Sequence, residues 1–265
     1  MQRGDAERQY EYALMHLRDE IPAANRDEGL YWLRRSAEQD NQRACAILGR
    51  NLLNDSAGEE MTREAILWLE HSAELGDAWA CEELGNLYLV GHAGGIHEKK
   101  PRHQLIQPNS GLAVEWYERG IALGWRAIAY SLGCLYLYGE HLMQDVCLAE
   151  KWLLHAAYAG SDSAQLVLGK EHASGLRLRR DSDAAIHWLT KASESRVSTG
   201  LVLGKIYLEG DLVARDFNKA IQWLTHAAGS DTFRVDAMNT VAELRVHAQL
   251  SASEETEAQE LLPAE

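Results

Sequence analysis

The sequence predicts an all-α fold in which about six helix pairs stack into a superhelical α-solenoid, with a further helix closing the C-terminal end. Two markers recur along the chain with one period. Tryptophans separated by 36, 48, 36, 36 and 35 residues form the first marker: Trp32, Trp68, Trp116, Trp152, Trp188 and Trp223. A Leu-Gly pair follows each of the first five by 15 or 16 residues and ends at Gly49, Gly85, Gly133, Gly169 and Gly204. Two independent markers that keep one period indicate a repeat architecture.

One repeat, residues 132–160, explains why the unit is a pair of helices. Leu132 and Leu135 recur at helical spacing and predict a first amphipathic helix, which Gly139 ends. Asp145 then supplies an N-cap for a second helix. In other repeats the matching caps are Asn25, Asn109, Asp181 and Asp216, and the matching glycines are Gly91, Gly175 and Gly210. Such a pair cannot bury its apolar face alone, so neighbouring pairs must stack.

The repeats make residues 1–250 a single solenoid domain. Its hairpins are expected near 4–40, 41–76, 77–124, 125–160, 161–195 and 196–229. Residues 231–250 lack the Leu-Gly pair and the Trp, and are predicted to form the capping helix. Residues 251–265 contain five acidic residues and no basic one, which predicts a disordered acidic tail.

The composition is that of an ordinary globular protein, with 46% hydrophobic and 25% charged residues and a net charge of −14. The acidic balance argues against nucleic-acid binding, which needs a basic face. No apolar run reaches the roughly 18 residues that a membrane span needs. The N-terminus as given has no secretory signal, so a cytoplasmic location is expected, or a periplasmic one if a signal peptide has been removed.

The combined pattern, A-x-x-x-LG-x-x-Y-x-x-G followed by D-x-x-x-A-x-x-W-x-x-x-AA-x-x-G, resembles the Sel-1-like repeat family, relatives of tetratricopeptide repeats. Residues 132–160 and 203–229 match best, and the first two hairpins match less well because Asp19 and Asp55 replace the helix-ending glycine. The resemblance implies a non-catalytic scaffold or adaptor of bacterial type that binds another protein. It is compatible with an immunity or adaptor protein for a secreted effector toxin, or with a regulatory or assembly component of an envelope or signalling complex.

Patterns of catalysis and metal binding are missing from the sequence. The nucleophile elbow, the phosphate loop and the dinucleotide fingerprint do not occur. The spacing of His92, His97 and His103 matches no common zinc site. The adjacent carboxylates Glu82 and Glu83 are interpreted as part of a solvated face. We therefore expect no catalytic residue, metal or cofactor, and a hydrolase is the least favoured alternative.

The four cysteines are expected to be reduced thiols, buried or half-buried: Cys45, Cys81, Cys134 and Cys147. Cys134 and Cys147 fall in one hairpin. Some secreted members of the resembled family staple their hairpins with a disulfide, and the sequence leaves open whether these two cysteines are bonded.

The partner is expected on the concave wall, which the first helices of the hairpins form in tetratricopeptide-like solenoids. The resemblance places these residues on that wall: Arg50, Trp79, Glu82, Asn86, Tyr130 and Tyr138. The repeat does not account for Trp79 and Trp125, and binding hot spots are rich in Trp, Tyr and Arg. The alternative is that both tryptophans fill wider gaps between repeats. We expect a protein partner, and a chain that is itself a monomer or a weak homodimer.

An insertion, residues 92–109, lengthens the third hairpin. Removing 12 residues between Gly91 and Asn109 restores the 36-residue period, so the insertion is predicted to be the turn between the two helices. Its basic residues, in an acidic chain, are candidate partner contacts: Lys99, Lys100 and Arg102. Long loops in a regular array are often binding elements, and an inert spacer is the alternative.

Overall fold

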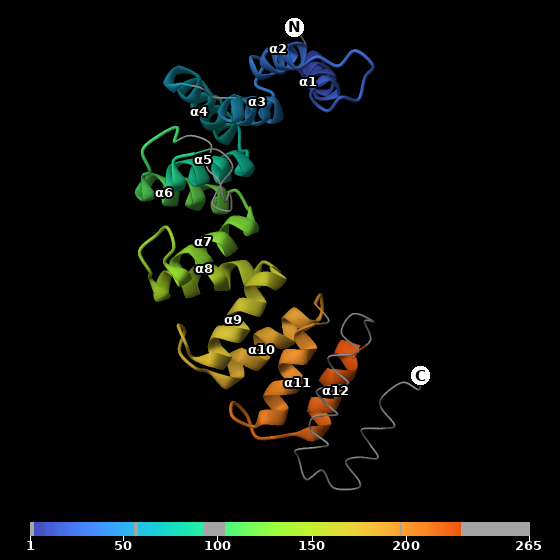
Figure 1. Cartoon of the computed structure of the whole chain (residues 1–265), viewed down its shortest axis with the longest axis vertical. Helices are drawn as coiled ribbons and strands as arrows, with labels where there is room; N and C mark the ends of the chain where they lie inside the picture. Colours follow the sequence, from blue (N-terminus) through green and yellow to red (C-terminus); the bar gives the residue numbers. More distant parts are fainter. Residues whose placement is uncertain (1–2, 56–57, 93–103, 197, 229–265) are drawn as a thin grey trace. The chain divides into compact units, whose positions relative to one another are not determined.

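The chain is helical throughout the parts that the computed structural model describes, residues 3–55, 58–92, 104–196 and 198–228 (Figure 1). It forms two compact units, Met1–Gln144 and Asp145–Glu265. The first unit holds α1 (Arg3–Leu17), α2 (Arg26–Ala37), α3 (Gln42–Asp55), α4 (Glu59–Glu74), α5 (Ala78–Val90), α6 (Ser110–Ala122) and α7 (Arg126–Tyr138). The second holds α8 (Val146–Tyr158), α9 (Asp162–Ser174), α10 (Ser182–Ser193), α11 (Thr199–Glu209) and α12 (Phe217–Ala228).

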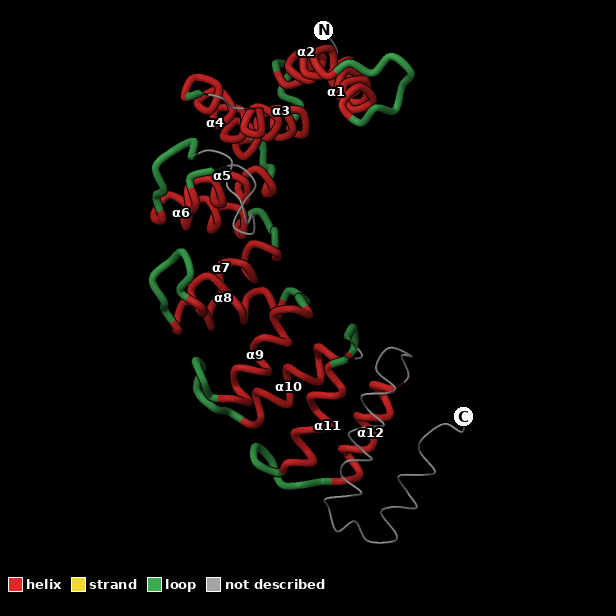
Figure 2. The backbone as a smooth tube through the Cα atoms, viewed as in Figure 1, coloured by secondary structure: helices red, strands yellow, loops and turns green. Residues whose placement is uncertain are grey.

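Within each unit, consecutive helices pack as hairpins, and neighbouring hairpins stack. In the first unit α1 packs on α2, α3 on α4 and α5 on α6, while α2, α4 and α6 each also contact the next helix. In the second unit α9 packs on α10 and α11 on α12, and α8 and α10 contact the helix that follows. Strands are absent from the described residues (Figure 2). The predicted all-α solenoid of helix pairs is confirmed, while the predicted capping helix and acidic tail lie outside the described residues.

The predicted caps explain where the second helix of each pair begins. The side chains of Asn25, Asn109, Asp145, Asp181 and Asp216 all accept a hydrogen bond from a backbone N–H in the first turn of the helix that follows. The preceding helix ends at a residue in the left-handed region, with φ of 80° at Gly91 and 71° at Gly139. Asp19, with φ of 56°, occupies this place in the first hairpin. Local sequence therefore fixes the ends of these helices.

The Leu-Gly marker has a packing explanation. The leucine is fully buried, as at Leu84, and the glycine lets the second helix approach closely. A Cβ atom added to Gly85 would lie 2.4 Å from the ring of Tyr117, a buried side chain of α6. The equivalent glycines Gly49, Gly169 and Gly204 would meet leucines of their own second helix at 2.6–2.7 Å. The marker therefore records the point where the helices of one hairpin cross.

The thiols differ in exposure, and one prediction is wrong. All four cysteines are free; Cys45 and Cys81 are buried and Cys134 is half-buried, but Cys147 is exposed. Cys147 lies two residues before the buried Ala149 of α8, and residues two apart on a helix do not share a face.

Thiol titration is expected to separate Cys147 from the buried pair. Burial raises the pKa of Cys45 to about 12 and also raises that of Cys81, so neither forms the reactive thiolate readily. With Ellman's reagent at pH 8, one thiol should react rapidly in the native protein and the others slowly or only in guanidinium. Cys147→Ser should remove the rapid phase, and rapid reaction of two or more native thiols would contradict this assignment.

Candidate functional site

Six residues predicted to contact a partner lie on three helices of the first unit, α3, α5 and α7, which are the first helices of their repeats. The structure brings two of them together across adjacent hairpins. The guanidinium carbon of Arg50 on α3 lies 5.3 Å from the ring centroid of Trp79 on α5. This distance permits a cation–π interaction, and α3 and α5 are in direct contact. Trp79 is half-buried, so its ring is partly available to a ligand.

A second contact joins α5 to the start of α7. The indole Nε1 of Trp125 donates a hydrogen bond to Oε2 of Glu82 at 3.0 Å, and Trp125 remains 40% exposed. Trp125 therefore contacts the preceding hairpin and is also partly exposed to solvent. We call Arg50, Trp79, Glu82 and Trp125 the tryptophan face.

Trp125 also occupies an unusual helix position. It is the N-cap residue of α7 and makes no side-chain capping bond. At the same position before α3, α5 and α9, the side chains of Asn41, Asp77 and Ser161 accept a backbone N–H. A helix without an N-cap side chain lacks about 1 kcal/mol of the stability that the cap contributes. A tryptophan at a position where other repeats have a capping residue is visible in the sequence. This signal could have identified Trp125 as a candidate contact residue.

Two neighbouring carboxylates on α5, Glu82 of the tryptophan face and the adjacent Glu83, are partly shielded from water. Glu82 and Glu83 are half-buried, so their interpretation as a solvated face is wrong. Burial raises the pKa of Glu82, which the hydrogen bond from Trp125 opposes. Burial likewise raises the pKa of Glu83, and the positive charge of Arg50 opposes this shift. Both carboxylates are therefore held among neighbouring hairpins rather than on a freely hydrated helix surface.

The remaining predicted residues are less available. The Oδ1 atom of Asn86 accepts a hydrogen bond from the hydroxyl of Tyr117 at 2.8 Å, inside the third hairpin. Tyr130 is half-buried and hydrogen-bonds the thiol of Cys134, whereas Tyr138 is 44% exposed at the end of α7. Lys99, Lys100 and Arg102 lie outside the described residues. The structure thus joins Arg50 with Trp79 and Glu82 with Trp125.

The insertion begins and ends where the repeat predicts. Its return is fixed by two hydrogen bonds, from the N–H groups of Leu105 and Ile106 to the carbonyl of Gly91 at 2.7 and 3.1 Å. Leu105 and Ile106 also pack against the core of the first unit. The ends of the insertion are therefore part of the third hairpin.

Comparison with known proteins accounts for this repeated geometry. The Sel1 repeat model matches residues 7–41, 43–77, 103–125, 129–161, 162–196 and 201–230. The chain belongs to the Sel1 repeat family. Proteins of this family are generally protein-interaction scaffolds. No curated protein matches the chain.

Two solved Sel1-type structures resemble the chain. One is c5321, a protective antigen of uropathogenic Escherichia coli strains with an SLR fold, at 26% identity and a TM-score of 0.60 over 97% of this chain and 52% of that one. The chain thus spans about half the length of this relative. The other is a Sel1 repeat protein from Oxalobacter formigenes, at 24% identity and a TM-score of 0.57 over 84% of this chain and 86% of that one. The second likeness supports the fold alone.

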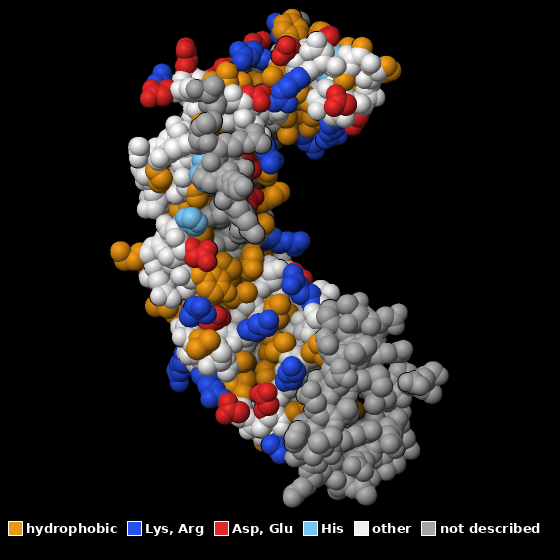
Figure 3. All heavy atoms as spheres, in the orientation of Figure 1, with side chains coloured by type: hydrophobic (Ala, Val, Ile, Leu, Met, Phe, Trp, Pro, Cys, Tyr) orange, Lys and Arg blue, Asp and Glu red, His pale blue; other side chains and the backbone are white. Residues whose placement is uncertain are grey.

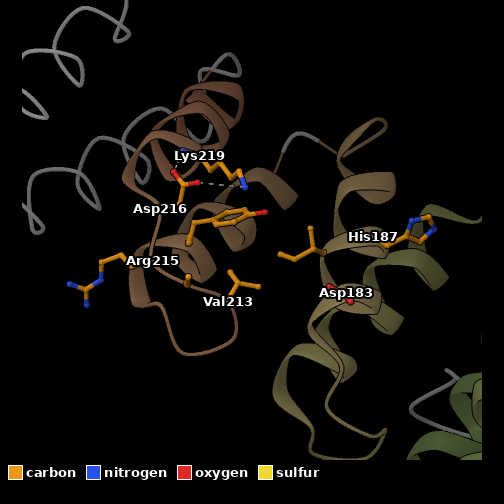
Figure 4. A pocket seen from close by; sticks show the side chains of 9 residues that line it. Asp183, His187, Val213, Arg215, Asp216 and Lys219 are labelled. Carbon is orange, nitrogen blue, oxygen red and sulfur yellow. Dashed lines mark hydrogen bonds and ion pairs between the residues drawn. The ribbon is translucent and has the colours of Figure 1, made fainter.

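Beyond the tryptophan face, the Sel1 repeats of the second unit form a pocket between α10 and the loop from α11 to α12. Asp183, His187, Tyr207, Asp216 and Lys219 are among its lining residues (Figure 4). The ammonium of Lys219 lies 3.5 Å from Asp216 and 5.2 Å from the ring centroid of Tyr207. Figure 4 shows Arg215 pointing away from the other side chains. Lys219, Asp216 and Tyr207 of this pocket are thus engaged with one another.

Neither a metal cluster nor a membrane helix is found in the described parts of the Sel1 repeats. Over those residues, His, Cys, Asp and Glu side chains do not gather in threes in a metal-binding arrangement. In the same part of the chain, every helix is too short or too polar to cross a bilayer.

Proposed function

We propose that this Sel1 repeat chain is a non-catalytic scaffold that binds a protein partner through the tryptophan face. The observation that carries the proposal is Trp125, a partly exposed indole at a position where three other first helices, α3, α5 and α9, have a capping side chain. Natural sequences depart from local stability rules chiefly at functional sites. Trp and Arg are the residue types most enriched in binding hot spots, and the tryptophan face contains two Trp and one Arg.

The tryptophan face combines the features of an interface centre. Trp79 and Trp125 offer large apolar surfaces, while Arg50 and Glu82 hold them in place through a cation–π contact and a hydrogen bond. Anchoring of this kind lowers the conformational entropy that is lost on binding. The net charge of −14 favours a partner with a basic surface, because complementary charge accelerates association.

Within this function, we propose an immunity or adaptor role in which the chain occupies a cognate effector. A regulatory or assembly role in an envelope or signalling complex is the second candidate. The relative that is a protective antigen of uropathogenic strains favours neither role for this chain. The identity of a partner captured through the tryptophan face distinguishes the two.

The test is a Trp79→Ala variant. The partner is first captured from the native cells with the immobilised chain, and its affinity is then measured by calorimetry. We expect affinity at least tenfold weaker, about 1.4 kcal/mol, because the ring and its contact with Arg50 are both lost. Helix content by circular dichroism should be unchanged, since Trp79 is only half-buried.

The matched control is Tyr31→Ala, which removes an aromatic ring that is 57% exposed on α2, a second helix of the same unit. It should bind like the parent chain. Parent-like affinity of Trp79→Ala would refute the proposed face, and Trp79→Phe tests whether an aromatic ring alone restores binding.

A further inference from the structure

Glu171, on α9 in the second unit, occupies a position where three other repeats place a buried aliphatic residue and the second repeat places Asn51, which is half-buried. It follows the repeat glycine by two residues, and the corresponding residues in other first helices include Leu87, Leu135 and Ile206. These three are 2%, 6% and 9% exposed, and Glu171 is 7% exposed. A carboxylate in a buried position costs free energy that a leucine would not.

Only one of the two carboxylate oxygens of Glu171 has a hydrogen bond that offsets the cost of its burial. Its Oε1 accepts a hydrogen bond from the guanidinium of Arg177 at 2.9 Å. Its Oε2 is shielded from solvent and has no hydrogen-bond partner among the described residues. Leaving such a group unmatched costs about 1–3 kcal/mol or more when it is charged. The contact with Arg177, in the loop after α9, accounts for the burial of Oε1. It does not account for the burial of Oε2.

Glu171 lines a groove of about 420 Å³ between α9 and α11. One side of the groove is apolar, with Val202 and Ile206 on α11 and with Leu176, which is 78% exposed. Glu209, an exposed carboxylate at the end of α11, also lines it. Hydrophobic and charged side chains lie side by side over the second unit (Figure 3). A third carboxylate in the lining, Asp211, is paired with Arg180 at 2.7 Å. The groove therefore offers apolar surface beside two further carboxylates, those of Glu171 and Glu209.

We propose that this groove binds an arginine side chain of a protein partner, with an aliphatic residue beside it. The guanidinium donates to Oε2 of Glu171 and lies near Glu209, while the aliphatic neighbour packs on Leu176 and Val202. Arginine suits the site because its planar guanidinium pairs with a carboxylate in low-polarity surroundings more readily than lysine does. Because Oε2 is shielded from solvent, this binding requires exposed side chains that line the groove, such as Lys170 and Leu176, to turn aside.

This site is separate from the tryptophan face and does not depend on it. Its probe is acetyl-Leu-Arg-amide, compared with the same peptide carrying citrulline, which has the shape of arginine without its charge. Backbone amide shifts of the full chain are followed by NMR during titration with each peptide. The arginine peptide should give saturable shifts confined to α9, α11 and their loops, and the citrulline peptide should bind at least fivefold more weakly.

Two variants separate binding from folding. Glu171→Leu installs the residue type of the third and fourth repeats, Leu87 and Leu135, and should abolish the shifts while the melting temperature stays the same or rises. Glu171→Gln keeps the shape of the side chain and one acceptor oxygen, and should weaken binding at least fivefold. Glu194→Gln removes an equal charge at the end of α10 and should bind the peptide like the parent.

The proposal is overturned if neither peptide gives saturable shifts, or if arginine and citrulline peptides bind equally. It is also overturned if Glu171→Gln binds the arginine peptide like the parent. A large fall in the melting temperature of Glu171→Leu, together with unchanged binding by Glu171→Gln, would assign Glu171 to holding the loop through Arg177.

Discussion

The Gly85→Ala variant is expected to lose about 1–3 kcal/mol of stability, although alanine favours helices over glycine by about 1 kcal/mol. The new Cβ would lie 2.4 Å from the ring of Tyr117. That ring cannot yield easily, because it is 1% exposed and its hydroxyl is hydrogen-bonded to Asn86. The two helices of the third hairpin must therefore separate. Thermal unfolding followed by circular dichroism should show a midpoint lower by roughly 3–10 °C.

The matched control is Gly111→Ala in the first turn of α6. A Cβ at Gly111 would meet only Oδ1 of Asn109, at 3.4 Å, and the residue is exposed. This variant should melt at or above the parental temperature. If Gly85→Ala melts like Gly111→Ala, close helix approach is not the reason for the Leu-Gly marker.

The Trp125→Ser variant is expected to bind the partner at least 30-fold more weakly, about 2 kcal/mol, without losing thermal stability. Serine restores the capping residue type found before α9, where the Ser161 hydroxyl accepts the N–H of Ala164 at 3.3 Å. A cap contributes about 1 kcal/mol, which offsets the lost contacts of a partly exposed indole. The effect on binding is expected to exceed that of Trp79→Ala, since Trp125 presents more of its ring to a partner.

Trp125→Phe serves as the comparison. It keeps an aromatic ring, supplies no cap, and leaves Glu82 without the indole donor. We expect intermediate affinity and a melting temperature below that of Trp125→Ser. A fall of more than about 5 °C in Trp125→Ser would show that the indole is structural, and parental affinity would remove Trp125 from the interface.

Part of the candidate site could be predicted from sequence, because the repeat assigns residues to the first helices and the family resemblance implies which of their positions share the concave wall. That reasoning placed Arg50, Trp79 and Glu82 on neighbouring first helices, and the structure brings them into the same region. It could not reveal that Asn86 is engaged by Tyr117, because that bond depends on a tyrosine where the equivalent positions of other second helices have leucine. It also misjudged Glu83 and Cys147, whose burial depends on neighbouring helices and on the helix face.

The sequence by itself determined the helices, their ends and their pairing. Caps such as Asp145, left-handed glycines such as Gly139 and the period of the tryptophans act locally or repeat many times, so one chain contains enough information to recognise them. Only the tertiary structure decided which side chains meet between hairpins: Arg50 with Trp79, Trp125 with Glu82, and Glu171 with a single partner for its two oxygens. Such contacts depend on side-chain packing between residues far apart in sequence, which periodicity does not encode.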